Sequence, residues 1–230
     1  MKDEEQNNKN ESPDLDDISI KCKVVLIGKS GVGKTSIISR YITDTFKDSL
    51  MTTPGANFIT KKVDFPQYKK SIKFEIWDTA GQERYRSLAK VFYNNAAACL
   101  LVFDITNKDS FDDIKNYWIP EIKENGQKDI ILALAGNKSD NYLKEQVSDN
   151  EGKALAKEIN AIYMRTSAKL NSSIDEIFNS IGNKFLNPEM EITSNLTREE
   201  MIQKSEKLRR DKIKLNNNSN NNNKNKKKCC

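Results

Sequence analysis

Apolar positions recur along the middle of the chain with two alternating spacings. Short runs rich in β-branched and aromatic residues predict strands over residues 21–27, 57–65, 71–77, 97–103, 130–135 and 161–164. Between them, apolar residues three and four positions apart predict helices over residues 34–41, 110–124, 149–158 and 173–185. Several strand runs are continuously apolar, which is typical of parallel strands covered on both faces.

This alternation predicts an α/β fold in which a six-stranded, mostly parallel sheet carries helices on both faces. The second and third strand runs are too close in sequence for a crossover helix, so we expect them to pair as an antiparallel hairpin. Residues 66–70 lengthen the turn of that hairpin. In such sheets, ligands bind at the carboxyl ends of the strands.

The two ends of the chain differ from this middle part. Residues 1–19 are acidic, rich in asparagine and poor in large apolar side chains, a composition that predicts disorder. The folded pattern weakens after residue 187. The expected division is therefore an extension over residues 1–19, a folded domain over residues 20–187 and a tail over residues 188–230.

Within the tail, Thr197 and Glu200 have capping-box spacing, which favours a charged helix over residues 198–215. Apolar residues at heptad spacing in it indicate either a docking stripe or chance: Met201, Leu208 and Leu215. We expect that helix to form only with a partner, if at all. The asparagine run over residues 216–223 is typical of a flexible spacer.

Composition narrows the function classes. A chain of 230 residues with a net charge of +5 fits one domain plus tails, and its basic charge gathers in a terminal tail, which argues against nucleic-acid binding. It contains no histidine, so histidine catalysis and histidine metal ligation are excluded. Cys22 and Cys99 fall in apolar strand runs, while Cys229 and Cys230 end the chain, which is not a disulfide pattern. Neither a signal peptide nor a membrane-spanning run is evident, and we expect a cytosolic protein.

A phosphate-binding pattern follows the first predicted strand, at residues 28–35 (Gly-Lys-Ser-Gly-Val-Gly-Lys-Thr). Its backbone N–H groups and the start of the next helix can hold phosphate oxygens. We expect Lys34 to reach the β- and γ-phosphates and Thr35 to bind Mg²⁺. The predicted nucleotide-binding residues here are Ser30, Gly31, Val32, Gly33, Lys34, Thr35 and Ser36. A glycine-rich connecting turn is the alternative, but a turn requires neither this lysine nor this threonine.

Two further strand ends favour guanine. Asn137-Lys138-Ser139-Asp140 follows the fifth strand run, and the Asp140 carboxylate can accept hydrogen bonds from the ring N–H and amine of guanine, whereas adenine offers no matching donors. After the sixth run, Ser167, Ala168 and Lys169 form a turn that can present the Ala168 N–H to the guanine carbonyl. Taken alone, each segment could be an ordinary polar loop; together with the phosphate loop they predict a guanine site.

Asp78-Thr79-Ala80-Gly81-Gln82-Glu83 follows the third strand run, which ends at Trp77. Asp78 is predicted to support Mg²⁺, the Gly81 N–H to sense the γ-phosphate, and Gln82 to orient the attacking water. Without a strong base, charge stabilisation is the main catalytic means, so intrinsic hydrolysis should be slow. A solvated acidic turn is the alternative.

The order of these motifs along residues 20–186 closely resembles that of the Ras superfamily of P-loop GTPases. The resemblance implies the fold of a Ras-like G domain. Within it, residues 77–85 (Trp-Asp-Thr-Ala-Gly-Gln-Glu-Arg-Tyr), residues 53–58 (Thr-Pro-Gly-Ala-Asn-Phe) and the terminal cysteine pair resemble Rab proteins. Residues 55–58 and 84–89 are most similar to the early-endosomal Rab subgroup. The resemblance implies a GTP/GDP switch in vesicle trafficking.

The resemblance also assigns residue roles. It implies that Thr53 joins Thr35 on Mg²⁺ and that Lys34, Gln82 and Thr53 serve hydrolysis. It implies that effectors read an aromatic triad, although ordinary core packing is the alternative for these rings: Phe58, Trp77 and Phe92. Pro54 departs from the family, where an aliphatic residue is usual, and should stiffen this segment.

Cys229 and Cys230 resemble a double geranylgeranylation site, which with lysines 224–228 would anchor the chain to membranes; an unmodified tail is the alternative. The implied ligands are GTP or GDP with Mg²⁺. The implied partners are an exchange factor, a GTPase-activating protein, Rab escort protein, GDP-dissociation inhibitor and effectors, with no nucleic acid. The implied location is the cytoplasmic face of intracellular membranes, notably early endosomes, with a cytosolic pool in the GDP state.

Two other function classes stay open at this point. One is a catalytically inactive, nucleotide-bound scaffold that recruits partners constitutively, against which Gln82 and Thr53 argue. The other is an ATP-using phosphotransferase, against which Asp140 argues. Single-turnover GTP hydrolysis tests the first, and nucleotide competition tests the second.

Overall fold

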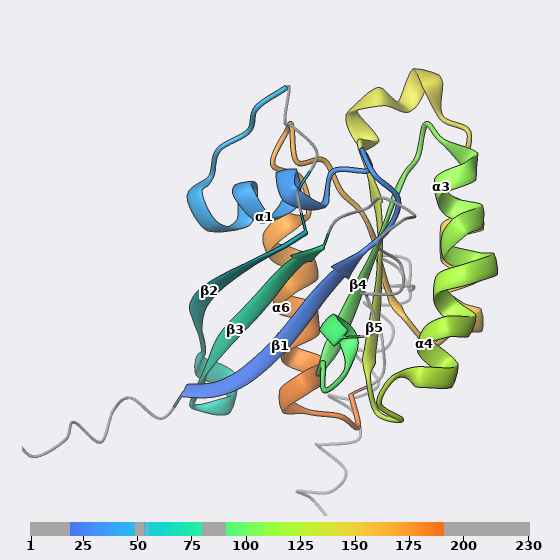
Figure 1. Ribbon diagram of the computed structural model, residues 1–230. Helices are drawn as coiled ribbons and strands as arrows, with labels where there is room; N and C mark the ends of the chain where they lie inside the picture. Colours follow the sequence, from blue (N-terminus) through green and yellow to red (C-terminus); the bar gives the residue numbers. More distant parts are fainter. Residues whose placement is uncertain (1–18, 49–52, 54, 80–90, 191–230) are drawn as a thin grey trace, which may run out of the picture.

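The computed structural model describes residues 19–48, 53, 55–79 and 91–190, and within them a six-stranded sheet has the order β2-β3-β1-β4-β5-β6 (Figure 1). The strands are β1 (Ser19–Ile27), β2 (Ala56–Phe65), β3 (Lys70–Thr79), β4 (Ala98–Asp104), β5 (Ile131–Asn137) and β6 (Ile162–Arg165). β2 runs antiparallel to β3, and the other pairs are parallel. The predicted fold class and hairpin are therefore confirmed, with strand ends within about two residues of expectation.

The hairpin between β2 and β3 turns through a short 3₁₀ helix, η1 (Pro66–Tyr68). Pro66 fixes the first φ of that helix, and Lys69 follows in the left-handed region at φ 51°. These residues account for the lengthened turn predicted from the sequence.

Helices cover both faces of the sheet (Figure 1). On one face lie α1 (Lys34–Thr43) and α6 (Ile174–Leu186), which contact each other. On the other lie α3 (Lys108–Asp113), the π-helical turn η3 (Ile114–Trp118), α4 (Ile119–Asn125) and α5 (Asp149–Glu158). The helix predicted over residues 110–124 is thus interrupted by a wider turn just before Pro120, a residue that has no N–H to continue the α-helical ladder.

Each face of the sheet has its own apolar core. Under α1 and α6, the ring of Tyr41 stacks on Phe178 with centroids 3.9 Å apart, and both meet Phe74 edge-on. On the other face, Phe103 and Phe111 pack in a T-shaped pair. These two cores hold all six strands in place, so the loops at their carboxyl ends leave a rigid frame.

Other sequence predictions fall partly outside the described residues. Cys22 and Cys99 are buried in β1 and β4, and burial raises the pKa of the Cys22 thiol to about 12. The N-terminal extension, the predicted helix over residues 198–215 and the spacer over 216–223 lie outside the described part of the chain, apart from Ser19, which opens β1. Among the helices that are described, none combines the length and apolar character that crossing a membrane would require.

Candidate nucleotide-binding site

The phosphate loop joins β1 to α1 and contains two glycines that no other residue could replace without strain. Gly33 precedes α1 at φ 100°, and a Cβ there would lie 2.4 Å from the side-chain nitrogen of Asn137. A Cβ on Gly28 would lie 2.1 Å from the carbonyl oxygen of Val102 in β4. The loop therefore runs close against the neighbouring strands, with the amino end of α1 directed at the space above it.

That space is a cavity of about 350 Å³ at the carboxyl edge of the sheet, within the range usual for small-molecule sites. Most of the residues predicted from the sequence line it: Ser30, Gly31, Gly33, Lys34, Thr35, Ser36, Thr53, Asn137, Lys138, Asp140, Ala168 and Lys169. Sequence reasoning missed five further lining residues: Phe46, Lys47, Asp48, Thr79 and Asn141. Val32 and Ser167, which were also predicted, do not line this cavity. The Val32 side chain is buried in the core and its carbonyl accepts a hydrogen bond from Asn137, whereas the prediction concerns its backbone N–H.

Lys34 is the buried cation of this cavity. Its Nζ donates to the carbonyl oxygens of Gly28 at 2.7 Å and Lys29 at 3.1 Å, so the side chain is folded over its own loop. Burial lowers the pKa of Lys34 to about 8, against the opposing attraction of Asp78. A bound polyphosphate would favour the charged form, which is the form that phosphate binding needs.

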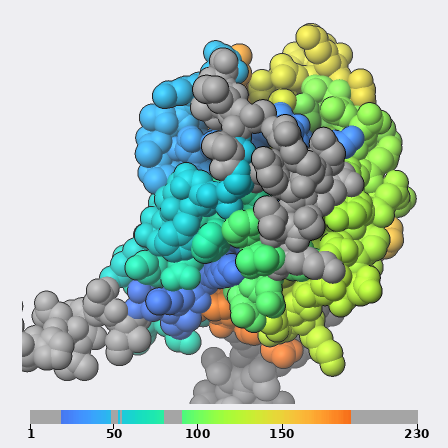
Figure 2. Space-filling model, viewed as in Figure 1, coloured from blue at the N-terminus to red at the C-terminus, as the bar shows by residue number. Residues whose placement is uncertain are grey.

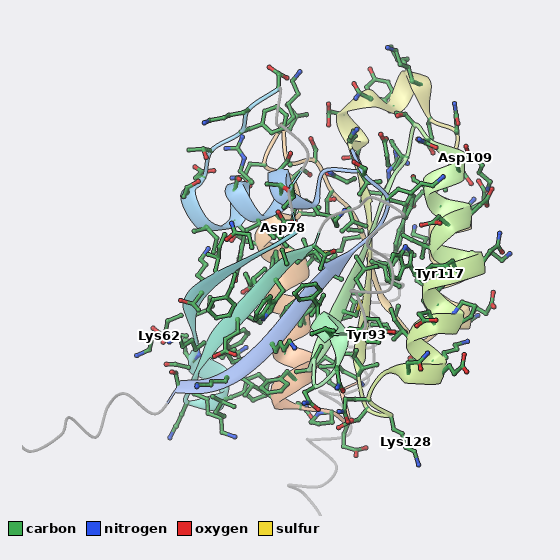
Figure 3. All side chains as sticks on the ribbon, viewed as in Figure 1. Lys62, Asp78, Tyr93, Asp109, Tyr117 and Lys128 are labelled. Carbon is green, nitrogen blue, oxygen red and sulfur yellow. The ribbon has the colours of Figure 1, made fainter. Side chains whose placement is uncertain are left out.

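Three oxygen-bearing side chains meet beside Lys34. The Thr35 hydroxyl donates to Asp78 Oδ2 at 2.6 Å and lies 2.8 Å from the Thr53 hydroxyl, whose own distance to Oδ2 is 3.4 Å. Asp78 ends β3, where Figure 3 shows it near α1. Its other oxygen, Oδ1, is buried with no hydrogen-bond partner among the described residues.

This cluster fits a hard divalent cation. Two hydroxyls and one carboxylate are oxygen donors of the kind that Mg²⁺ uses when nucleotide phosphates complete its shell. Burial raises the pKa of Asp78, which means that its charged form lacks sufficient compensation in the protein alone. A cation near the unpartnered Oδ1 would supply it. Thr35, Thr53 and Asp78 were predicted from positions far apart in the chain, and the fold brings them together.

At the other end of the cavity lies Asp140, the residue predicted to recognise a base. It lies at the start of η4 (Ser139–Lys144), and its Oδ1 accepts a 2.6 Å hydrogen bond from the Ser167 hydroxyl. Lys138, in the left-handed region at φ 63°, places its Nζ 2.8 Å from Asp104 Oδ2. The Asp140 carboxylate is thus oriented by a neighbouring loop, and its other oxygen is left to accept from a ligand.

Asn137 connects the two ends of the site. Its buried amide donates to the Val32 carbonyl at 2.8 Å, and its Oδ1 accepts from the Thr166 hydroxyl at 3.3 Å and from Ala168 N–H at 3.4 Å. Asn137 was predicted to bind nucleotide; it lines the cavity, and its contacts also bridge the phosphate loop and the loop over residues 166–169, which we call the base loop. The same geometry directs the Ala168 N–H towards Asn137.

Two more residues that support these loops carry no motif. Arg40 of α1 donates from Nε to the Ala168 carbonyl at 2.9 Å and so ties the base loop to the helix that follows the phosphate loop. Arg165, at the end of β6, forms a two-pronged pair with Glu145, with contacts of 3.1 and 2.7 Å. Glu145 directly follows η4, so this pair fixes the segment that carries Asp140.

The predicted aromatic triad is in contact. Ring centroids lie 5.0 Å apart between Phe58 and Trp77 and 5.5 Å apart between Trp77 and Phe92. Phe58 exposes 47% of its surface, which is unusual for a ring that serves only core packing. The other predicted site residues, Gly81, Gln82, Cys229 and Cys230, lie outside the described residues, as does Pro54.

Comparison with known proteins agrees with this geometry. The model of the Ras family matches residues 23–187. Ras-related protein RabJ of Dictyostelium discoideum is 45% identical over 74% of this chain and 65% of its own length, so the chain spans slightly less than two thirds of that relative. GTP-binding protein YPT53 of Saccharomyces cerevisiae is 41% identical over 83% of this chain and 88% of its own length. Human Ras-related protein Rab-22A is 43% identical over 70% of this chain and 82% of its own length.

Proposed function

This chain belongs to the Ras family as a Rab-type small GTPase of vesicle trafficking, and from that premise we propose that it acts as a magnesium-dependent switch on endosomal membranes. As a member of the family it binds GTP and GDP and hydrolyses GTP. The observation that carries the proposed mechanism is the meeting of Thr35, Thr53 and Asp78 beside Lys34.

In this mechanism the phosphate loop and Lys34 hold the polyphosphate, while Asp140 selects guanine and Ala168 and Lys169 close around the base. Thr35, Thr53 and Asp78 would hold Mg²⁺, which when bound neutralises phosphate charge. Thr53 comes from the segment between α1 and β2, whereas Thr35 and Asp78 belong to α1 and β3. Ordering of Thr53 towards the other two therefore couples the nucleotide state to the segment that precedes Phe58.

For hydrolysis, we assign Gln82 to orient water and the Gly81 N–H to sense the γ-phosphate, as the family motif implies. The chain offers no histidine base, so positioning and charge stabilisation carry the reaction. Intrinsic turnover is then slow, and a GTPase-activating protein that supplies a cation accelerates it.

Partners and membrane attachment complete the proposal. Effectors recognise Phe58, Trp77 and Phe92, whose contiguous rings offer a partly exposed aromatic surface. Geranylgeranyl groups on Cys229 and Cys230 anchor the chain, because two chains hold a protein stably where one is marginal. Rab escort protein, GDP-dissociation inhibitor and an exchange factor are the further partners that this cycle requires. The folded domain over residues 20–187 serves the switch and the tail serves the anchor.

Nucleotide titration of wild type and Asp78→Asn tests the site. In wild type, removal of Mg²⁺ should weaken GDP binding, and ATP should not compete. Asp78→Asn keeps the shape but removes the charge, so its GDP affinity should lose most of the dependence on Mg²⁺. Asp109→Asn is the matched control, because this acid lies in the first turn of α3, away from the cavity (Figure 3). Equal affinity with and without Mg²⁺ in wild type would refute the proposed metal site, and preference for ATP would favour a phosphotransferase.

Single-turnover hydrolysis of GTP separates a switch from an inactive scaffold. Gln82→Leu should slow hydrolysis with little change in GTP affinity. If wild type fails to hydrolyse GTP even with a cell extract, the scaffold is the better description.

A further inference from the structure

The outer face of β1, β3 and β2 carries a row of three lysines. The strand register sets Lys62 opposite Lys73 and pairs Lys73 with Lys21. Paired positions on neighbouring strands point to the same face of a sheet, so the three lysine side chains leave this face at adjacent positions. Figure 3 shows Lys62 on β2, and Figure 2 shows these strands as cyan and blue surface on one side of the molecule. We call Lys21, Lys73 and Lys62 the lysine row.

Like charges at directly opposed positions destabilise a sheet. The acidic side chains that the described strands add to this face compensate only partly. Glu75 lies 3.8 Å from Lys21 and also interacts with Lys23, while Asp64 accepts a hydrogen bond from Ser71 at 2.6 Å. Among the described residues of these strands, four lysines and two carboxylates lie on this face, and Lys62 has a further interaction of its own. The strands themselves therefore contribute more positive than negative charge, which an anionic partner would offset.

The chain itself supplies such an anion next to this face. β1 begins at Ser19, two positions before Lys21, and the residues ahead of it hold seven acidic side chains against two lysines. The acidic residues are Asp3, Glu4, Glu5, Glu11, Asp14, Asp16 and Asp17. Because this segment is covalently tethered to β1, its effective concentration at the lysine row is on the order of millimolar, far above that of a separate peptide.

The length of the segment suits the same surface. Ser12-Pro13-Asp14 is a turn signal, so residues 1–11 can reverse and run back along the sheet. Eleven extended residues span about 36 Å, whereas the six positions from Ser71, level with Ser19, to Trp77 span about 20 Å. A reversed segment therefore reaches across the lysine row as far as the aromatic triad.

We propose that residues 1–18 dock on the lysine row as an acidic intramolecular cover of the β1-β3-β2 face. This docking goes beyond the GTPase activity and stands on charge, register and chain length. Only its consequence, competition with a partner for Phe58 and Trp77, rests on the proposed function.

Lysine acetylation of the full-length, GDP-loaded chain, followed by mass spectrometry, tests the docking. The test variant replaces the seven acidic residues before Ser19 with Asn or Gln. In wild type at low salt, the lysine row should react about threefold or more slowly than in this variant, because several weak exposed ion pairs add together. In 0.5 M NaCl the difference should disappear. Exposed lysines of η3, α4 and the following loop are internal controls that should react equally in both proteins: Lys115, Lys123 and Lys128.

Carbodiimide cross-linking identifies the contact itself. We expect links from the acidic segment to the lysine row, within one molecule and at a rate independent of protein concentration. Links only to the tail lysines 224–228, links between isotopically light and heavy copies, or equal acetylation of the row in both proteins would each overturn the proposal. GTP hydrolysis is measured in the same preparations, so that a failure of the docking proposal can be told apart from a failure of the proposed GTPase function.

Discussion

Replacing Asn137 with alanine tests whether the two halves of the nucleotide site depend on one buried amide. The change removes three hydrogen bonds, to the Val32 carbonyl, the Thr166 hydroxyl and the Ala168 N–H. Net contributions of neutral hydrogen bonds are near 1 kcal/mol, and the two contacts longer than 3.2 Å belong at the low end, so the total is about 2 kcal/mol. If this energy holds the loops in their binding geometry, GDP should dissociate about 30-fold faster.

Release of a fluorescent GDP analogue into excess unlabelled GDP measures this rate directly. Chemical unfolding of the same variant reports its effect on the free energy of unfolding. Asn125→Ala is the control, because Asn125 is an exposed amide at the end of α4 that donates to Glu121 of the same helix and does not line the cavity. A GDP release rate within about twofold of wild type, together with a loss of stability, would show that the amide supports the fold and does not organise the site.

Three further predictions follow from other contacts. The pKa of Lys34 is lowered to about 8 in the free protein, so above pH 8 nucleotide binding must take up a proton. Nucleotide affinity should therefore fall above pH 8 by up to tenfold per pH unit, which titration of nucleotide-free protein with nucleotide from pH 7 to 9.5 measures. Tyr41→Phe should raise the free energy of unfolding by about 1 kcal/mol, since the buried Tyr41 hydroxyl has no hydrogen-bond partner in the described part of the chain. Arg165→Glu should speed GDP release by roughly fivefold, and adding Glu145→Arg should restore it by reversing the pair.

Each of these has a contrasting measurement. For Lys34, an affinity that is flat above pH 8 would mean that the side chain stays charged in the free protein. For Tyr41, the matched variant is Tyr93→Phe, which removes a 2.8 Å hydrogen bond to Glu121 and should destabilise the fold. For the Glu145–Arg165 pair, a double variant as fast as the single one would show that the residues act separately.

Local patterns in the sequence were enough to predict the frame of the molecule. The strands, the hairpin and the phosphate loop each depend on residues that are close in sequence, and glycines such as Gly33 mark backbone that only glycine adopts. The meeting of Thr35 with Asp78 was also predictable, because both follow strands whose carboxyl ends share one edge of the sheet.

Contacts made by single side chains across the fold were not predictable in this way. Arg40 reaches the Ala168 carbonyl 128 positions away, and nothing in the spacing of α1 marks it. Glu145 and Arg165 read as ordinary surface charges until the sheet places them together. The wider turn at η3 was missed for a different reason: the apolar periodicity continues through it, and only Pro120 hints at the change.

The opposite pKa shifts of Lys34 and Asp78 explain why this site should need both of its ligands. Burial disfavours the charged form of each residue, lowering the pKa of Lys34 and raising that of Asp78. For Asp78, a folded-state pKa above the unfolded value favours the fold at low pH, and this stability is lost as the pH rises and the carboxyl ionises. A phosphate anion beside Lys34 and a cation beside Asp78 remove both costs together. Nucleotide with Mg²⁺ should therefore raise the thermal midpoint by more than the sum of the shifts that each ligand gives alone, and strictly additive shifts in a thermal melt would argue against this coupling.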